Sequence, residues 1–281
     1  MEVEPAQTTL RDIQLCELDI LCRFSDVCEA HGLTYYMVGG TLLGAARTQG
    51  FIPWDDDIDV AMPRDDYERL ASLYRENNGL LGEQFFYQDH TTEPHYYLPY
   101  AKIRKRASYA CEPEFAKARY TEQGVFIDIF PLDPCPPKSA SLRFCYKLLA
   151  VIHSRTRVLS GCKKPQGKRL IWHIAYLVTC LIPAKWLLRI RDRILAHLRK
   201  KSNGEWFASF SGSYGYPLEI FDAKIYGNGV KLEFERRYFN APTDYVRQLR
   251  QIYGNSYMDL PEQKQRKLHI DVENSYTEVN R

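Results

Sequence analysis

The sequence lacks the cysteine spacing of a structural zinc site. No two cysteines form a C-x-x-C pair, and no histidine stands at zinc-ligand spacing from a cysteine pair. The eight cysteines are scattered through a chain of 281 residues, and free thiols in a chain of this size are typical of a reducing compartment. Cys16, Cys22 and Cys28 stand among apolar residues, where cysteine acts as a small core hydrophobe.

The sequence also shows no signal sequence, no membrane span and no internal repeat. The first seven residues are polar and acidic, unlike the charged and then apolar start of a signal sequence. The apolar stretch Leu170–Ile182 contains His173, precedes Pro183, and is too short to cross a bilayer. With 45% hydrophobic and 26% charged residues, the composition excludes disordered, collagen-like and disulfide-dense classes. We therefore expect a cytoplasmic globular protein, held at most peripherally at the inner face of a membrane.

Charge is distributed unevenly along the chain. Residues 138–201 hold sixteen Lys and Arg against the single acid Asp192, whereas the remainder holds twenty-two basic and thirty-four acidic residues. Such asymmetry indicates an anionic partner for one region. We interpret 138–201 as a basic helical insert that lies on a membrane surface or faces a lipid-linked acceptor. A buried helix with a solvated basic flank is the alternative, and the apolar stretch argues against a nucleic-acid partner.

Hydrophobic periodicity predicts alternating helices and strands. Expected helices are Thr9–Ala30, Thr41–Thr48, Pro63–Glu76, Ser139–Ser160, Leu170–Arg199 and Asp244–Gln251. Expected strands are Leu33–Val38, Asp57–Met62, Phe85–Gln88, Tyr97–Arg104 and Val125–Ile129. Four prolines between 131 and 137 predict a stiff connector. We divide the chain into a catalytic core (1–137), the basic helical insert (138–201) and a C-terminal part that completes the catalytic domain (202–281).

An acidic strand predicts a metal site. Because alternate side chains of a strand share a face, Asp55, Asp57 and Asp59 point one way and Ile58 points into the core. Packed carboxylates repel one another, and a divalent cation removes that cost. Asp57 and Asp59, together with nucleotide phosphates, suit Mg²⁺, with Mn²⁺ as the alternative. For Asp55 and Asp56 a solvated turn remains an equal interpretation.

A Gly-Gly pair precedes the expected helix Thr41–Thr48. Gly39 and Gly40 let a backbone approach closely, and the N–H groups at the start of a helix bind phosphate. The pair lies between one strand and the acidic strand, which makes a phosphate-binding turn at Gly39, Gly40 and Thr41 a more specific prediction than the glycines alone.

Several segments resemble the LicD family of phosphocholine transferases, whose eukaryotic relatives are fukutin and the fukutin-related protein. The most specific segments are Gly39–Arg47, with the sequence GGTLLGAAR, and Phe51–Asp59, with FIPWDDDID. Three more agree: Lys102–Arg104 with the family's basic strand, Phe126–Asp133 with its second acidic block, and Tyr253–Pro261 with its C-terminal motif. The resemblance thus covers nearly the whole chain.

The resemblance implies an α+β fold of nucleotidyltransferase type, with a mixed sheet flanked by helices, a helical insert and a C-terminal helical part. It also implies a third carboxylate from a later strand. Asp128 fits that place, because an acid between Ile127 and Ile129 needs a partner or a metal. Asp133 follows Pro131 and is expected in a loop.

Further residues are candidates for holding the donor. Arg47, Lys102 and Arg104 are candidates for phosphate oxygens, with ordinary surface charge as the alternative for both arginines. Trp54 is a candidate for stacking on a base or covering a cationic choline, with plain packing as the alternative. No histidine stands in a triad spacing, and His269 near the C-terminal motif is assigned no role.

The implied reaction moves a phospho-alcohol from a CDP-linked donor to a sugar hydroxyl of a lipid-linked glycan, polysaccharide, teichoic acid or lipopolysaccharide precursor, with release of CMP. Choline, ribitol and glycerol phosphates all remain open. One alternative is a nucleotidyltransferase that adds a nucleotide to a small molecule or RNA. Another is a non-catalytic glycan-binding relative, which the intact acids disfavour.

Overall fold

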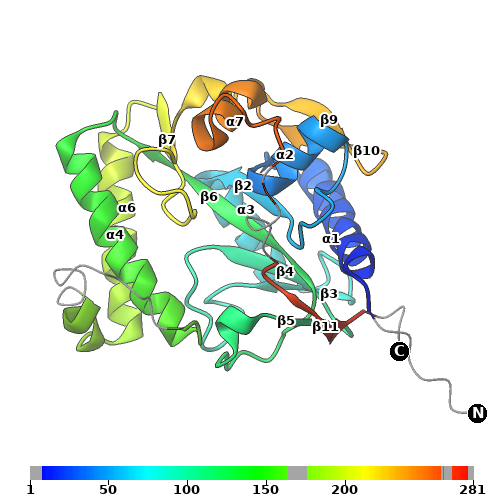
Figure 1. Ribbon diagram of the computed structural model, residues 1–281. Coiled ribbons are helices and arrows are strands. Elements are labelled where there is room, and N and C mark those ends of the chain that lie inside the picture. Colours follow the sequence, from blue (N-terminus) through cyan, green and yellow to red (C-terminus); the bar gives the residue numbers. More distant parts are fainter. Residues whose placement is uncertain (1–7, 164–175, 261, 263–267, 278–281) are drawn as a thin grey trace, which may run out of the picture.

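A computed structural model describes residues 8–163, 176–260, 262 and 268–277. The fold is mixed α/β, with one large mixed sheet flanked by helices (Figure 1). Along the sheet the strand order is β1-β2-β6-β4-β3. These strands are β1 (Tyr36–Met37), β2 (Asp59–Pro63), β6 (Phe126–Cys135), β4 (Ala101–Lys105) and β3 (Phe85–Gln88).

Local sequence signals define the first helix as expected. Helix α1 (Leu10–His31) begins after Thr9, whose side chain and Asp12 form a reciprocal capping box. Gly32 ends the helix in the left-handed conformation, with φ at 61°, which glycine adopts without a steric cost. The buried face of α1 packs with the sheet in the main hydrophobic core.

The centre of the sheet joins the two acidic strands. Strand β2 runs parallel to β6, and Asp59 lies opposite Asp128. Strand β4 runs antiparallel to the other side of β6, where Lys102 also lies opposite Asp128. Helices α2 (Gly39–Thr48) and α3 (Arg64–Glu76) precede and follow β2 and both pack on it. The predicted start of β2, at Asp57, lies two residues before the observed start, and the predicted start of α2, at Thr41, lies two residues after it.

The predicted proline connector is wrong. Strand β6 continues through Pro131 and Pro134 to Cys135, and its last part pairs with the short β7 (Trp206–Ala208). Asp133, expected in a loop, is a strand residue and is buried. Proline is tolerated in a strand at positions where its missing N–H is not required for a hydrogen bond to the neighbouring strand. Strand β7 in turn pairs with β8 (Ile220–Asp222), so chain from the C-terminal part extends the large sheet.

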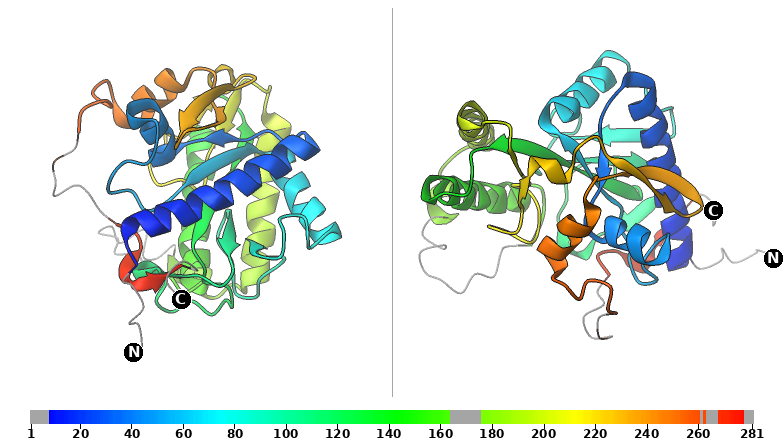
Figure 2. Two further views of the ribbon diagram at one scale, coloured as in Figure 1. Left: turned by 90° about the vertical axis from the view of Figure 1, so that its right-hand side faces the viewer. Right: turned by 90° about the horizontal axis from the view of Figure 1, so that it is seen from above.

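Two long helices pack together on the side of the molecule away from α1 (Figure 2). Helix α4 (Ala140–Leu159) begins at the cap Ser139, as predicted. Helix α6 (Ala184–Lys201) begins after Pro183. A single helix over Leu170–Arg199 is therefore wrong, because proline lacks the N–H that a helix interior requires; residues 164–175 lie outside the described part of the chain. Both helices contribute to a second hydrophobic core beside β7 and β8.

The remaining elements lie at different places around the large sheet (Figure 1). A hairpin joins β9 (Val230–Phe234) to β10 (Arg237–Ala241). Helix α7 (Tyr245–Tyr253) has Asp244 as its cap. Strand β11 (Asp271–Tyr276) pairs with β5 (Tyr109–Cys111), and the short helices η1 (Pro113–Phe115) and η2 (Ala223–Ile225) complete the described elements. Within the described residues, no helix is both long and apolar enough to cross a membrane.

Candidate active site

The acidic segment before β2 lines a large cavity. Asp55, Asp57 and Asp59 all border this space of about 720 Å³, which we call the acidic cavity. Asp55 and Asp57 precede the strand, which begins at Asp59, yet the side chains alternate as expected. Asp56 points the other way and is completely buried. The solvated-turn interpretation of Asp56 is therefore wrong, whereas Asp55 is half-buried at the edge of the cavity.

The two glycines bring this acidic segment onto the start of α2. A Cβ on Gly39, which has φ at +57°, would lie 2.7 Å from Asp59 Oδ2, and a Cβ on Gly40 would lie 2.5 Å from Asp55 Oδ2. Only glycine leaves room for both carboxylates. The cap residue Val38 supplies no side-chain hydrogen bond to the first turn of α2. Thr41 Oγ1 accepts the Asp59 N–H at 2.8 Å and ties the helix to the strand.

Burial and mutual repulsion act on the acids of the cavity. Burial, with Asp57 as the next cause, raises the pKa of Asp55 to about 8. Burial raises the pKa of Asp57 to about 6, against the opposing effect of His269. The pKa of Asp59 is raised well above its usual range by burial and by Asp57. Three neighbouring carboxyl groups with raised pKa values are not easily ionised at the same time. A hard divalent cation bound to their oxygens would stabilise the ionised forms.

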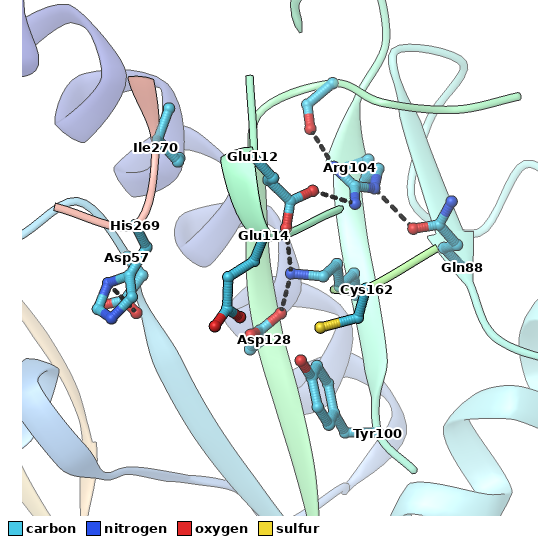
Figure 3. Close-up of polar contacts among 12 residues, drawn as sticks. Asp57, Gln88, Tyr100, Arg104, Glu112, Glu114, Asp128, Cys162, His269 and Ile270 are labelled. Atoms are coloured by element: carbon cyan, nitrogen blue, oxygen red, sulfur yellow. Dashed lines mark hydrogen bonds and ion pairs between the residues drawn. The ribbon is translucent and has the colours of Figure 1, made fainter. Parts of the chain in front are cut away.

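Asp128 lies beside this cluster but already has a partner. It stands opposite Asp59 on the neighbouring strand, and Lys102 Nζ lies 2.8 Å from its Oδ1. Lys102 also lies 3.4 Å from Glu112, and Figure 3 shows the resulting chain of contacts. Burial raises the pKa of Asp128, and Lys102 opposes that shift. The structure thus brings Asp128 close to the acids without placing it on the acidic cavity.

Arg104 lies away from the acidic cavity. It is completely buried, and its guanidinium donates to Gln88, to the carbonyl of Gly124 and to Glu112 at 2.6, 2.7 and 2.8 Å. Lys102 is buried equally deeply. Neither side chain borders the cavity where a donor would bind, so both act within the sheet, on Glu112 and Asp128. Asp133 is likewise occupied, because Arg64 donates to both its oxygens at 2.7 and 2.9 Å.

Arg47 and Trp54 both border the acidic cavity, as expected. Arg47 donates to the carbonyl oxygens of Tyr257 and Asp259. The arginine therefore fixes the C-terminal motif against the end of α2. One guanidinium nitrogen of Arg47 is occupied by these carbonyls. Arg47 therefore holds the C-terminal motif at the cavity, in addition to any contact that it makes with phosphate.

His269 is the residue that sequence reasoning passed over. Its backbone N–H and that of Ile270 donate to Asp56 Oδ2 at 2.5 and 2.6 Å, and its Nδ1 lies 3.1 Å from Asp56 Oδ1 and 3.4 Å from Asp57 Oδ2. Contact with Asp56 raises the pKa of His269 to about 9. Asp56, Asp57 and His269 lie close enough together to hold a metal ion. No local pattern in the sequence could have found this contact, because His269 and Asp56 are 213 residues apart in the chain.

An aromatic wall stands across the acidic cavity. Tyr214, on the loop between β7 and β8, and Tyr253, at the end of α7, both border it. Their hydroxyl oxygens are 2.7 Å apart, and their rings meet nearly perpendicularly at 81°. Neither tyrosine had been singled out as a site residue, although Tyr253 begins the C-terminal motif.

Comparison with known proteins identifies the family. The model of the LicD/FKTN/FKRP nucleotidyltransferase domain matches residues 32–139, which include the glycine pair, the acidic segment and Asp128. The lipopolysaccharide cholinephosphotransferase LicD of Haemophilus influenzae is 32% identical over 271 residues, covering 93% of this chain and 96% of that protein. The human ribitol 5-phosphate transferase FKRP is 29% identical over 110 residues, covering 38% of this chain but only 18% of that protein. The chain therefore belongs to the LicD family and is an enzyme that transfers a phosphate-containing group.

Proposed function

We propose that this enzyme transfers phosphocholine, or a related phospho-alcohol, from a CDP-linked donor to a sugar hydroxyl of a cell-surface glycan precursor. The observation that carries the proposal is the acidic cavity itself, where Asp55, Asp57 and Asp59 meet at the start of α2. Similarity along nearly the full length of a cholinephosphotransferase supports the transferred group. The shorter similarity to a ribitol 5-phosphate transferase keeps polyol phosphates as the related class.

We assign Mg²⁺, or Mn²⁺ in its place, to Asp57 and Asp59, with Asp128 as the third carboxylate. The residues fit such an ion, because Asp57 and Asp59 border the cavity together, and burial and neighbouring carboxylates raise the pKa of both. When bound, the ion would neutralise charge on the donor's diphosphate and on the departing CMP. His269 stands close enough to Asp57 to orient that carboxylate.

The chain's own groups account for the rest of the transfer. We propose that the N–H groups at the start of α2, where Gly39 and Gly40 border the cavity, receive phosphate oxygens. The sugar hydroxyl oxygen attacks the phosphorus that bears the alcohol, and the bond from that phosphorus to the oxygen of CMP breaks. The hydroxyl proton passes to a carboxylate. Asp128 is our candidate, and this role requires its carboxylate to turn from Lys102 toward the cavity.

The test is incubation of the enzyme and Mg²⁺ with a glycan acceptor and CDP-choline, CDP-ribitol or CDP-glycerol in turn. Release of CMP together with a phospho-alcohol on the sugar would support the proposal. Nucleotide transfer is the second candidate, favoured by the nucleotidyltransferase description of the matching domain. It would instead attach the nucleotide to the acceptor and release pyrophosphate from a nucleoside triphosphate.

Asp128 should reach the metal. In a crystal soaked with Mn²⁺, we expect its carboxylate to coordinate the ion directly or through one water molecule, because it lies opposite Asp59 on the adjacent strand. Anomalous scattering from Mn²⁺ would locate the ion. A carboxylate still bound only to Lys102, with no water between it and the ion, would remove Asp128 from the metal site.

The basic helical insert has the surface of a membrane-docking element. Leu177, Leu181 and Trp186 are 62%, 86% and 53% exposed, although they are large and apolar. Lys185 is exposed beside them, and the Arg189 guanidinium lies 5.4 Å from the centre of the Trp186 ring. Apolar side chains mixed with cations match the interface of an anionic bilayer. We propose that this edge rests on the membrane that holds a lipid-linked acceptor.

Vesicle co-sedimentation tests this contact. We expect binding to vesicles of anionic lipids, little binding to neutral vesicles, and weaker binding at high salt, because each cation near the surface contributes about 1 kcal/mol and is screened by salt. Leu181→Glu and Trp186→Glu should each lower binding. Tyr238→Glu is the control, since Tyr238 is 64% exposed on β10, across the molecule from α4 and α6 (Figure 2). Equal and negligible binding to both vesicle types would rule the contact out.

A further inference from the structure

Tyr214 and Tyr253 form an aromatic corner on the acidic cavity. The ring centres are 5.5 Å apart and the ring planes stand at 81°, so the edge of one ring meets the face of the other. Their hydroxyl groups bond to each other. The two hydroxyl groups are thus engaged with each other, and the rest of each ring is apolar aromatic surface.

The corner is held rigidly by buried contacts. Glu219 is 3% exposed, and it accepts the N–H groups of Tyr214 and Gly215 at 3.3 and 3.0 Å and the hydroxyl of Tyr146 at 2.7 Å. It thereby shapes the loop that carries Tyr214.

Helix α7, which carries Tyr253, is tied to the same loop. Gln251 Nε2 donates to the carbonyls of Leu218 and Ile220 at 2.6 and 3.0 Å. Two segments that are distant in the sequence therefore present their tyrosines in one fixed arrangement, which is the preorganisation that a binding subsite requires.

The surroundings of the corner are rich in carboxyl groups. Among the residues that the structure describes, five carboxyl groups border the acidic cavity, whereas Arg47 and His269 are the only basic side chains that do so. The lining carboxylates are those of Asp55, Asp57, Asp59, Glu219 and Asp259. Acids also act directly on the corner: burial and Asp59 both raise the pKa of Tyr214, to about 12.

Charge and surface together select one class of ligand group. A quaternary ammonium cannot donate a hydrogen bond, and it binds through aromatic faces and nearby negative charge. A polyol, by contrast, requires several directed hydrogen-bond partners to replace water. We propose that Tyr214 and Tyr253 form the subsite for the quaternary ammonium end of the donor, and thereby select choline over polyols and neutral alcohols. This proposal rests on the proposed function and names the alcohol that the site accepts.

The test compares two donors that differ in charge alone. CDP-choline and the CDP ester of 3,3-dimethylbutanol have the same shape, but the second has carbon in place of the charged nitrogen. Calorimetric titration with Mg²⁺ and without acceptor should show the enzyme binding CDP-choline about tenfold more tightly. Tyr214→Leu and Tyr253→Leu should each bring the ratio of the two dissociation constants toward one. Tyr253→Phe, which retains the ring, should keep most of it.

Each variant serves as its own control for folding, because a general structural defect weakens both ligands alike and leaves their ratio unchanged. Tyr238→Leu, on the exposed face of β10, should have the wild-type ratio. Equal binding of the two ligands by the wild-type enzyme would overturn the subsite, even if CMP release proved the transfer. A clear preference without any CMP release would support the subsite and count against the proposed function.

Discussion

Replacing either Asp57 or Asp59 with asparagine is expected to lower phospho-alcohol transfer by a factor on the order of 10³ or more while the fold survives. Both side chains border the acidic cavity, and an amide lacks the charge that holds a divalent ion against a diphosphate. Burial and mutual repulsion oppose ionisation of both carboxylates. Their removal should therefore leave the melting temperature unchanged or raise it.

The measurement pairs the rate of CMP release with thermal unfolding of the same preparation. Mn²⁺ binding, followed by electron paramagnetic resonance, separates loss of the ion from loss of chemistry. Asp26→Asn is the matched control, because Asp26 is exposed on the outer face of α1. A near wild-type rate in either Asp57→Asn or Asp59→Asn would refute its assignment as a metal ligand.

Asp56→Ala is expected to detach the chain that follows the C-terminal motif. Asp56 is completely buried and accepts the N–H groups of His269 and Ile270 through one oxygen. With alanine these two donors lose their partner, which should lower the free energy of unfolding by about 3 kcal/mol. Because His269 is thereby freed from its place beside Asp57, transfer should fall by at least about tenfold.

Amide hydrogen exchange in residues 268–277 reports this detachment directly. We expect faster exchange there in Asp56→Ala than in the wild type, and a smaller change in Asp56→Asn, whose amide oxygen still accepts both N–H groups. Asp19→Ala controls for the loss of an acid, since Asp19 lies on α1 and its half-exposed side chain pairs with Lys105. Unchanged exchange in Asp56→Ala would show that β11 is held by its pairing with β5 alone.

Much of the fold could be predicted because its signals are local. The cap at Thr9, the left-handed glycine at Gly32 and the helical period between them define α1 from neighbouring residues alone. The errors arose where the tertiary structure overrides local preference. Prolines that predicted a connector lie within β6, because strands β2 and β7 on its sides supply pairing where it is needed.

For the candidate site too, local features could be predicted from the sequence and distant contacts could not. Alternation along 55–59 and the glycine pair were sufficient to predict three acids at the start of a helix, since strand period and glycine sterics act over a few residues. The basic residues were less predictable: Lys102 and Arg104 match a family segment, yet both are buried in contacts with Asp128, Gln88 and Glu112.

The sequence by itself determined the acidic segment, the glycine pair before α2, the resemblance to the LicD family and the charge of the basic helical insert, because these depend on residue type and short spacing. Only the tertiary structure decided that His269 reaches Asp56 and Asp57 from more than two hundred residues away. It alone placed Tyr214 against Tyr253. Such contacts depend on how sheet edges and loops pack, and no periodicity in the chain records which distant segments will meet.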